Sequence, residues 1–391
     1  MDKIVVIMPT YNEATNISLM IEELVGVEFP KIVKAEMLLL VVDDNSPDGT
    51  GDIVKDYMKK YQNVHLLAGE KKGLGWAYIR GMRYAEKMLG ADAVIEMDAD
   101  FQHDPKYVVR LVNAYLKGAD YVIGSRYIKG GSIPKSWALP RKLMSFFGNL
   151  FARVMLFRLN LHDITTGFRL TRVKGVLEKI KLESLRELDR FAYKIDLFFQ
   201  TTKLTKNVVE VPIHFKQRTK EVSKFNIKEM IASYKLVVQI RLDESKRLIR
   251  FGIVGGTGFV INYAFIRVFR YLSVPEIFSW LFATELAIVN NFVFNNIWTF
   301  SEKKINGIKD TFLKFIQFNA TSAGALVIQS VLGPLGVRMF GEKYTILVLG
   351  FVVGFVVLPY NYLMYNLVIW KTWKLPFGKK TKVRDSSCNN G

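Results

Sequence analysis

Four long apolar stretches in the last part of the chain constrain its fold more than any other feature. They cover approximately residues 251–272, 277–298, 312–340 and 344–370. Each is about 20 residues or longer, which is the length that an α-helix needs to cross the hydrocarbon core of a bilayer. We therefore expect residues 250–374 to form an all-α transmembrane domain of four helices, followed by a basic polar tail at 375–391.

The basic residues around these stretches indicate how the chain is oriented. The chain has 55 Lys and Arg against 36 Asp and Glu, and 15 of the basic residues lie from residue 250 onward. With four spans, one side of the membrane holds 11 of those 15: Arg250, Lys303, Lys304, Lys309, Lys314, Lys371, Lys374, Lys379, Lys380, Lys382 and Arg384. The positive-inside rule therefore places residues 1–249 and both termini in the cytoplasm, at the cell membrane or the endoplasmic reticulum membrane. Membrane lipid accounts for this charge more simply than nucleic acid, so we expect no nucleic-acid partner.

The first 200 residues alternate between short apolar runs and helical patterns. The runs are rich in Val, Ile and Leu and suit buried parallel strands: Ile4–Met8, Met37–Val42, Val64–Leu67 and Ala93–Met97. Helical patterns lie at Asn16–Val25, Asp52–Tyr61 and Trp76–Leu89, the first with Thr15 or Asn16 as its N-cap. This order predicts a Rossmann-like α/β domain, in which ligands bind at the carboxyl ends of the strands.

Asp98 and Asp100 form the sharpest chemical signal in the chain. Residues two apart on a strand point to the same side, so the two carboxylates can converge on one hard cation, with the Gln102 amide as a further ligand. An isolated Asp-x-Asp is more often a solvated turn. Here it follows an apolar strand, and two earlier strands also end in acidic residues, so we predict Mg²⁺ or Mn²⁺ bound with a nucleotide diphosphate.

Five motifs together resemble a family 2 glycosyltransferase of the GT-A fold, and within that family the dolichyl-phosphate mannose synthases. They are Pro9-Thr10-Tyr11-Asn12-Glu13, Asp43-Asp44-Asn45-Ser46-Pro47-Asp48-Gly49-Thr50, Lys72-Gly73-Leu74-Gly75, Asp98-Ala99-Asp100-Phe101-Gln102-His103 and Gly124-Ser125-Arg126-Tyr127. Further matches at Thr166-Gly167-Phe168-Arg169 and at Arg218 with Ser223-Lys224 extend the resemblance over residues 1–225. The last part is similar to a GtrA-type membrane domain, on Arg250-Phe251-Gly252-Ile253-Val254-Gly255-Gly256-Thr257, Asn290-Asn291-Phe292 and Trp298-Thr299-Phe300.

The resemblance implies a role for each matched residue. The nucleotide-binding residues would be Pro9, Tyr11, Glu13, Asp43, Asp44, Asp98 and Lys224. The metal ligands would be Asp98, Asp100 and Gln102, and the catalytic residues Asp100, Arg126 and Arg218. A planar guanidinium group suits bidentate contact with phosphate, so the two arginines would neutralise the diphosphate and the acceptor.

Two amphipathic segments connect the α/β domain to the membrane. The first, about residues 138–158, repeats Leu143, Phe146, Phe147, Leu150, Phe151 and Val154 at three- and four-residue steps. The second, within 226–249, repeats Ile227, Ile231, Tyr234 and Val238. Periodicity alone fits either helices in the bilayer interface or helices packed on the domain's own core, and the nearby spans favour the interface. Arg141 and Ser145, together with Arg126, would then receive the phosphate of a lipid emerging there.

These features predict an inverting transferase that moves mannose from GDP-mannose to dolichyl phosphate on the cytoplasmic face. An alternative within the class transfers glucose from UDP-glucose to a polyprenyl phosphate. A processive polysaccharide synthase is disfavoured, because Gln217-Arg218 is not followed by Trp. A lipid-glycan flippase with a non-catalytic nucleotide-binding domain is the alternative from another class, and the retained Asp98, Asp100 and Arg126 argue against it.

Overall fold

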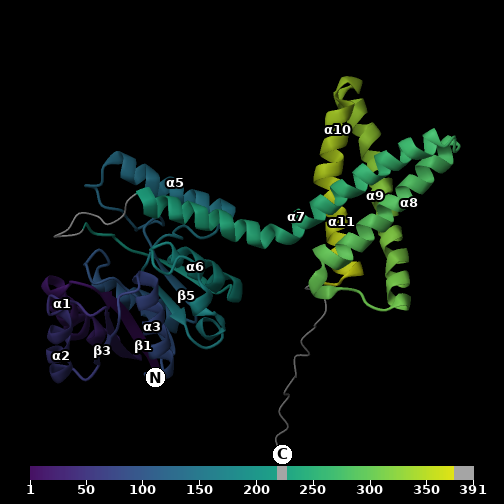
Figure 1. Ribbon diagram of the computed structural model, residues 1–391. Helices are drawn as coiled ribbons and strands as arrows, with labels where there is room; N and C mark the ends of the chain where they lie inside the picture. The colour runs from purple at the N-terminus through teal and green to yellow at the C-terminus, as the bar shows by residue number, and fades with distance from the viewer. Residues whose placement is uncertain (218–226, 374–391) are drawn as a thin grey trace, which may run out of the picture. The chain divides into compact units, whose positions relative to one another are not determined.

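The computed structural model describes residues 1–217 and 227–373. The chain forms two compact units, Met1–Asp243 and Glu244–Gly391 (Figure 1). The α/β fold expected for the first part and the helical fold with four apolar helices expected for the second are both confirmed. Arg218, Lys224 and the predicted tail at 375–391 lie outside the described residues, and the domain boundaries predicted at 225, 249 and 374 stay predictions.

The first unit is built on one seven-stranded sheet with the order β3-β2-β1-β4-β6-β5-β7. Its strands are β1 (Asp2–Thr10), β2 (Ala35–Asp43), β3 (Val64–Ala68), β4 (Ala93–Glu96), β5 (Tyr121–Ser125), β6 (Arg169–Arg172) and β7 (Val208–Pro212). The four strands predicted from the sequence, β1 to β4, are mutually parallel as expected. β6 runs antiparallel to both of its neighbours, β4 and β5, so β5 runs parallel to the first four strands.

Helices cover both faces of this sheet. Successive strand residues point to opposite faces, so an apolar strand presents hydrophobic side chains to the helices on both faces. The helices of the unit are α1 (Ala14–Ile21), α2 (Thr50–Lys60), α3 (Leu74–Lys87), α4 (Val108–Leu116), α5 (Leu139–Met155) and α6 (Tyr193–Leu204). Ile4 and Val6 of β1 pack with α1, α2 and α4, whereas Val5 and Ile7 pack with α3 and α6. The strand core is thus buried on both faces, which explains the continuous apolar runs in the sequence.

The first helix begins earlier than its sequence predicts. Neither Thr15 nor Asn16 is its N-cap: the cap is Glu13, and the helix starts at Ala14. Asn12 has a φ of 60°, which turns the chain sharply after β1. Side chains that follow β2 then accept hydrogen bonds from the backbone N–H groups at the helix start. Asp48 accepts from Ala14 N and Thr50 accepts from Glu13 N, both at 3.0 Å. A long-range contact therefore replaced the expected local cap.

The two amphipathic segments are helical, and each has one packed and one exposed face. The second forms the start of α7 (Ile227–Tyr271), which lies beside α5 (Figure 1). Ala152 of α5 and Leu156, just after the helix, pack with Leu236, Val237 and Ile240 of α7, and the rings of Phe151 and Tyr234 are 4.9 Å apart. The opposite face of α5 exposes Leu143, Phe146, Phe147 and Val154, and α7 exposes Ile231 and Val238. The packed faces fit the interpretation of helices on the domain's own core, whereas placement of the exposed faces in the bilayer interface stays a prediction.

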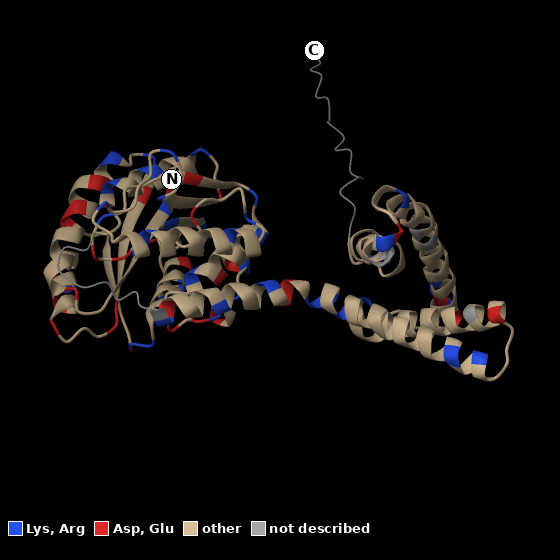
Figure 2. Ribbon diagram, turned by 90° about the horizontal axis from the view of Figure 1, so that it is seen from above, with Lys and Arg blue, Asp and Glu red and all other residues tan. Residues whose placement is uncertain are grey.

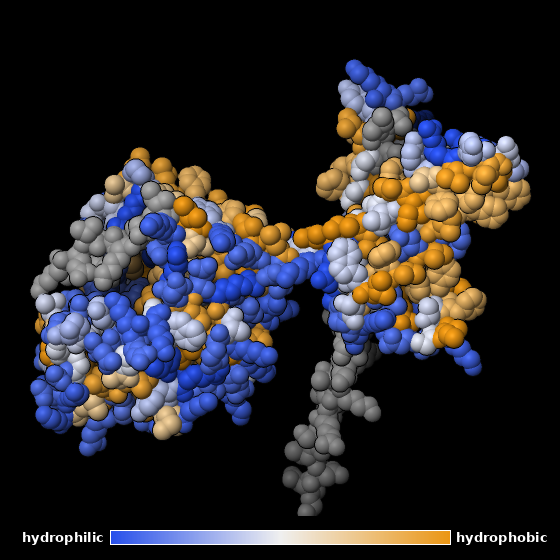
Figure 3. All heavy atoms as spheres, in the orientation of Figure 1, coloured by the Kyte–Doolittle hydropathy of each residue, from blue (hydrophilic) through white to orange (hydrophobic). Residues whose placement is uncertain are grey.

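The second unit consists of long apolar helices. They are the later part of α7, α8 (Glu276–Phe294), α9 (Ile308–Phe340), α10 (Thr345–Val352) and α11 (Leu358–Met364), with π-helical turns after α8, α10 and α11. Within the described residues, four segments are long and apolar enough to cross a membrane: Lys228–Tyr271, Glu276–Thr299, Ile308–Phe340 and Gly350–Ile369. In Figure 2 charged residues gather on the first half of α7 and are few along the middle parts of the other helices, and Figure 3 shows hydrophobic side chains over much of the second unit's surface.

Candidate active site at the carboxyl edge of the sheet

The carboxyl ends of β2, β1, β4 and β5 meet at one edge of the first unit's sheet. β6 separates β4 from β5 and, being antiparallel, begins at that same edge. The strand order thus brings together Asp43, Asp98 and Arg126, which are far apart in the sequence. Ligands of open α/β sheets bind at such edges.

The acidic loop after β2 is held mainly by its own contacts. The Asp43 carboxylate accepts hydrogen bonds from Thr10 Oγ1 at 2.8 Å, from Ser46 N at 2.9 Å and from Ser46 Oγ at 2.6 Å. Asp44 pairs with Arg80 at 2.8 Å, and burial raises the pKa of its carboxyl despite that guanidinium. These two carboxylates fix the loop against β1 and α3.

The residues after β1 form the neighbouring wall of the site. Pro9 is the penultimate residue of β1 and pairs with Val42 of β2. The Nζ of Lys71 lies 3.3 Å from the ring centre of Tyr11, a cation–π contact. Glu13 Oε2 accepts a hydrogen bond from Asn16 Nδ2 at 2.8 Å. An aromatic ring and a cation thus stand together beside the acidic loop.

Asp98 and Asp100 lie in a loop, whereas the sequence pattern placed them on a strand. β4 ends at Glu96, so strand spacing does not set their directions. Instead Phe101 has a φ of 58°, and Asp100 Oδ1 accepts the backbone N–H of Gln102 at 3.1 Å. This sharp turn brings the loop back on itself and leaves Asp100 only 6% exposed.

The Asp98 carboxylate already has partners on the protein. Its Oδ1 accepts a hydrogen bond from Tyr78 Oη at 2.7 Å and lies 3.4 Å from Lys194 Nζ. Its Oδ2 is 3.9 Å from Nδ1 of His103. Burial by itself would raise the pKa of Asp98, but the Lys194 ammonium and the Tyr78 hydroxyl hold it below the ordinary value. Asp98 is therefore ionised near neutral pH.

These residues fit a divalent cation that is shared with a phosphate ligand. Within the described parts of the chain, no group of three or more His, Cys, Asp or Glu is arranged to hold a metal ion. Mg²⁺ is commonly bound by one or two carboxylates together with substrate phosphates and water. Two carboxylates, from Asp98 and Asp100, match that ligand set, and the Gln102 amide stands next to them in the same loop.

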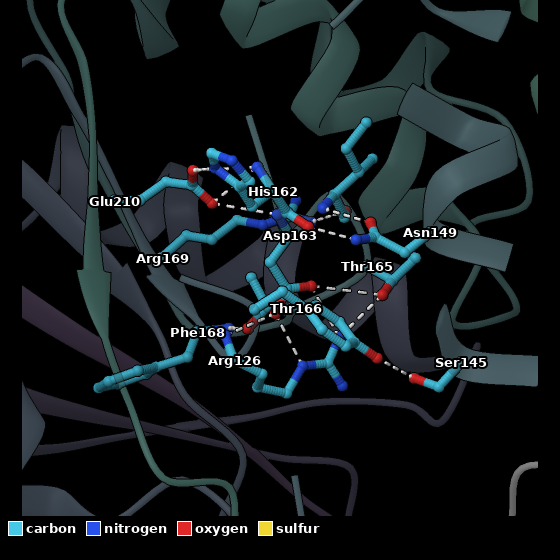
Figure 4. A network of polar contacts seen from close by, with 12 residues as sticks. Arg126, Ser145, Asn149, His162, Asp163, Thr165, Thr166, Phe168, Arg169 and Glu210 are labelled. Carbon is cyan, nitrogen blue, oxygen red and sulfur yellow. Dashed lines mark hydrogen bonds and ion pairs between the residues drawn. The ribbon is translucent and has the colours of Figure 1, made fainter. Parts of the chain in front are cut away.

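Arg126 is held by a buried ion pair at the end of β5 (Figure 4). Its Nε and Nη2 each bind one carboxylate oxygen of Asp163 at 2.7 Å, and Nη2 also binds Thr165 Oγ1 at 2.8 Å. Backbone N–H groups of His162 and Asp163 in turn bind Glu210 of β7 at 2.9 to 3.0 Å. The Arg126 side chain is 8% exposed and Asp163 is 0% exposed, so the guanidinium has a fixed position.

One face of α5 meets this network. Ser145 Oγ lies 2.6 Å from the hydroxyl of Tyr127, the residue after Arg126. One turn further, Asn149 accepts the backbone N–H of Ile164 at 2.9 Å and donates to the carbonyl of His162 (Figure 4). Arg141, one turn before Ser145, stacks its guanidinium 4.0 Å above the Trp137 ring. Residues 141, 145 and 149 thus present one polar face of an otherwise apolar helix to the sheet edge.

Aromatic rings connect this face with the carboxylate loop. The Phe215 ring lies 6.0 Å from Trp137, 5.4 Å from the Arg126 guanidinium and 5.3 Å from His103. The proposed acceptor residues and the metal-site loop therefore border one shared aromatic cluster. Arg218 and Lys224 follow soon after Phe215 but lie outside the described residues, so their predicted roles stay predictions.

Comparison with known proteins agrees with this site. Residues 5–178 match the protein family described as "Glycosyl transferase family 2", and residues 250–370 match the family described as "GtrA/DPMS, transmembrane domain". A dolichol-phosphate mannosyltransferase of Pyrococcus furiosus is 33% identical over 361 residues, which cover 91% of this chain and 97% of that protein. The chain belongs to the dolichol-phosphate mannosyltransferase family. It is a glycosyltransferase with a membrane domain.

Two further relatives of this mannosyltransferase-family chain align with a smaller share of it. An undecaprenyl-phosphate mannosyltransferase of Micrococcus luteus is 40% identical over 225 residues, covering 57% of this chain and 88% of that protein. A polyprenol monophosphomannose synthase of Mycolicibacterium smegmatis is 37% identical over 253 residues, covering 63% and 91% respectively. Each alignment covers most of the relative but less than two thirds of this chain.

Several residues that shape the mannosyltransferase site were missed by sequence reasoning. Asp163 lies 37 residues from Arg126, and Lys194 lies 96 residues from Asp98, so no local spacing pointed to either pair. Lys194 did carry a signal, because it is a charged residue within the apolar run Phe191–Phe199. His103 is also buried in the site, at 3% exposed, and stacks on Phe168 with ring centres 5.2 Å apart.

Proposed function

We propose that the chain transfers mannose from GDP-mannose to dolichyl phosphate, giving dolichyl phosphate mannose and GDP with inversion at the anomeric carbon. The names of the three relatives agree on mannose and on a polyprenyl phosphate acceptor, and they differ in the lipid. One observation carries the proposal: Asp98 and Asp100 share a sheet edge with Arg126 and with the polar face of α5. A donor site with acidic metal ligands and an acceptor site with fixed cations therefore lie next to each other.

In this proposal, one part of the sheet edge binds the donor and another part binds the acceptor. Pro9, Tyr11, Glu13, Asp43 and Asp44 surround the nucleoside, and Asp98, Asp100 and Gln102 hold the divalent cation, Mg²⁺ or Mn²⁺. When bound, such a cation neutralises negative charge on the departing diphosphate. Arg126 holds the acceptor phosphate in line with the anomeric carbon, with Arg141 and Ser145 on α5 beside it. Arg218 and Lys224 contribute further positive charge at the donor phosphates.

The acceptor itself removes the need for a general base. A phosphate monoester has a second pKa of about 6 and is mostly a dianion at neutral pH. Its oxygen can attack without giving up a proton to the enzyme, so positioning and charge neutralisation remain as the enzyme's tasks. Burial lowers the pKa of His103 to about 4, so its ring is neutral at pH 7. We assign His103 a packing role beside the metal loop.

This role predicts the behaviour of His103→Gln. We expect the variant to keep most of its turnover and to lose about 1–3 kcal/mol of unfolding free energy, because stacking on Phe168 and Phe215 is lost. Turnover at saturating donor and acceptor, together with thermal unfolding in detergent, checks this. An inactive but folded variant that still binds metal and GDP would contradict the base-free mechanism.

The proposed orientation places the first unit and both termini in the cytoplasm, where GDP-mannose is made available to the site. The basic residues on that side of the spans support this orientation. The exposed apolar faces of α5 and α7 would lie in the adjoining bilayer interface, close to the lipid's phosphate. Cysteine labelling of single-cysteine variants from each side of sealed vesicles tests this orientation.

A substrate panel tests the proposed reaction. Purified protein in detergent is offered GDP-mannose, UDP-glucose, UDP-galactose and GDP-glucose, each with dolichyl phosphate and with undecaprenyl phosphate. We expect mannosyl-phosphoryl lipid from GDP-mannose. Because the proposed transfer inverts the anomeric carbon, the product should have the β configuration, opposite to that of the donor. Transfer from UDP-glucose alone would favour the glucosyltransferase, and no transfer with intact nucleotide binding would favour the flippase.

Arg141→Ala tests whether Arg141 binds the acceptor's lipid phosphate and not the donor nucleotide. We expect the KM for the lipid phosphate to rise roughly tenfold or more, because a charge-assisted phosphate contact is lost. GDP affinity is expected to stay nearly unchanged, since Arg141 stacks on Trp137, outside the nucleotide loops. Lys142→Ala, a neighbouring change of the same charge, serves as the control. Equal losses of lipid and nucleotide affinity in Arg141→Ala would contradict the assignment.

A chain ending at Asp243 tests what the membrane unit contributes. We expect measurable transfer in detergent, because the described residues of the proposed site lie before that point and α7 still packs through Leu236, Val237 and Ile240. Asp243 also keeps its ion pair with Arg186 at 2.6 Å. Complete inactivity of a folded truncation would give the spans a direct part in the reaction.

A further inference from the structure

A fully buried lysine under the carboxylate loop has no part in the mechanism described so far. Lys194 is the second residue of α6, and its side chain is 0% exposed. The Nζ lies 4.8 Å from the ring centre of Tyr78 and 4.9 Å from that of Phe191. At Gly167 a Cβ would collide with Nζ of Lys194, so the glycine leaves space for the ammonium group. Several separate segments thus combine to place one cation at this point.

The ammonium group acts on one particular oxygen. Nζ of Lys194 lies 3.4 Å from Asp98 Oδ1, which also accepts the Tyr78 hydroxyl at 2.7 Å. The other oxygen, Oδ2, lies 3.9 Å from Nδ1 of His103. Lys194 and Tyr78 therefore occupy Oδ1, and Oδ2 is the Asp98 oxygen that can turn towards a metal ion.

The charges at the site make metal binding depend on a second ligand. Asp98 and Asp100 bring two negative charges, and the Lys194 ammonium offsets one of them at a few ångströms. A divalent cation at these carboxylates is also repelled by the ammonium, and such repulsion is strong where water is excluded. A nucleotide diphosphate supplies both the missing negative charge and further oxygen ligands.

We propose that Lys194 is a positioning residue that prevents tight metal binding to the empty site and so makes the metal bind together with the nucleotide diphosphate. This inference rests on the proposed function, because it takes a metal and a nucleotide diphosphate as the ligands. By linkage, each ligand then raises the affinity of the other by the same factor. Loss of the ammonium charge reduces that factor, mainly by strengthening metal binding in the absence of nucleotide.

The experiment measures Mn²⁺ binding directly, without lipid or sugar transfer. Free Mn²⁺ is titrated by electron paramagnetic resonance into the full chain in detergent, with and without saturating GDP. Lys194→Gln keeps a hydrogen-bond donor for Asp98 without the charge, and Lys194→Met keeps the volume of the side chain. Lys181→Met, which removes an exposed lysine of the same unit, is the control. Circular dichroism and thermal unfolding establish that each variant is folded.

We expect Mn²⁺ affinity without GDP to rise roughly tenfold or more in Lys194→Gln or Lys194→Met, and the effect of GDP on it to shrink by the same factor. Lys181→Met should match the original protein. Unchanged Mn²⁺ affinity in a folded Lys194 variant would overturn the inference. An original protein that transfers mannose but binds Mn²⁺ equally well with and without GDP would overturn it too, while leaving the proposed function in place. If GDP raises Mn²⁺ affinity in a way that depends on Lys194, but the protein transfers no mannose, the inference is supported and the proposed function is rejected.

Discussion

Asp100→Ala should lower turnover by roughly 100-fold or more, because charge developing on the departing diphosphate loses its counter-ion. Asp100 is the better of the two carboxylates for this test. Asp98 also binds Tyr78 and Lys194, so replacing it would disturb the packing beneath the loop. The measurement is the rate of mannosyl transfer at saturating donor, with and without added Mn²⁺.

Two further variants make the Asp100 result specific. Asp100→Asn keeps an oxygen that can accept the Gln102 backbone N–H, so the turn is preserved while the charge is removed. We expect it to be nearly as inactive as Asp100→Ala. Asp52→Ala, which removes an aspartate with a 79% exposed side chain from α2, should retain full activity. Transfer at an ordinary rate in excess chelator would exclude a catalytic metal at this loop.

Breaking the Arg126–Asp163 pair should give the second large effect, this time on stability as well as on activity. Asp163→Asn leaves the Arg126 guanidinium, 8% exposed, without its buried counter-charge. Removing one member of a buried ion pair costs about 3–5 kcal/mol of unfolding free energy. Denaturant unfolding in detergent measures this, and Asp52→Asn at an exposed pair should leave stability unchanged.

The double variant separates the two roles of Arg126. In Arg126→Met with Asp163→Asn, neither an unpaired guanidinium nor an unpaired carboxylate remains, so part of the lost stability should return. Activity should not return, because the cation proposed to hold the acceptor phosphate is absent. Recovery of both stability and transfer in the double variant would show that the pair serves the fold alone.

The amino-acid sequence by itself determined the parts that depend on local pattern. Apolar length predicts the four membrane helices, and the runs of Val, Ile and Leu predict β1 to β4, because burial on both faces leaves a signal in consecutive residues. The residue types of the motifs also indicated the family, and the relatives agree. Strands β5, β6 and β7 were not predicted from such runs, and their pairing depends on distant partners.

Only the tertiary structure decided which partner each charged side chain has. The Asp43 carboxylate accepts hydrogen bonds from Thr10 and Ser46, and its predicted place at the nucleotide stays a prediction. Arg126 pairs with a residue 37 positions away and Lys194 with one 96 positions away. The Arg126 pair arises because β6 runs antiparallel between β4 and β5, so its start lies at the same edge as their ends, whereas Lys194 is placed by the packing of α6 with α3. Spacing along a chain reports burial and local turns, whereas the contacts of a buried charge depend on strand order in three dimensions.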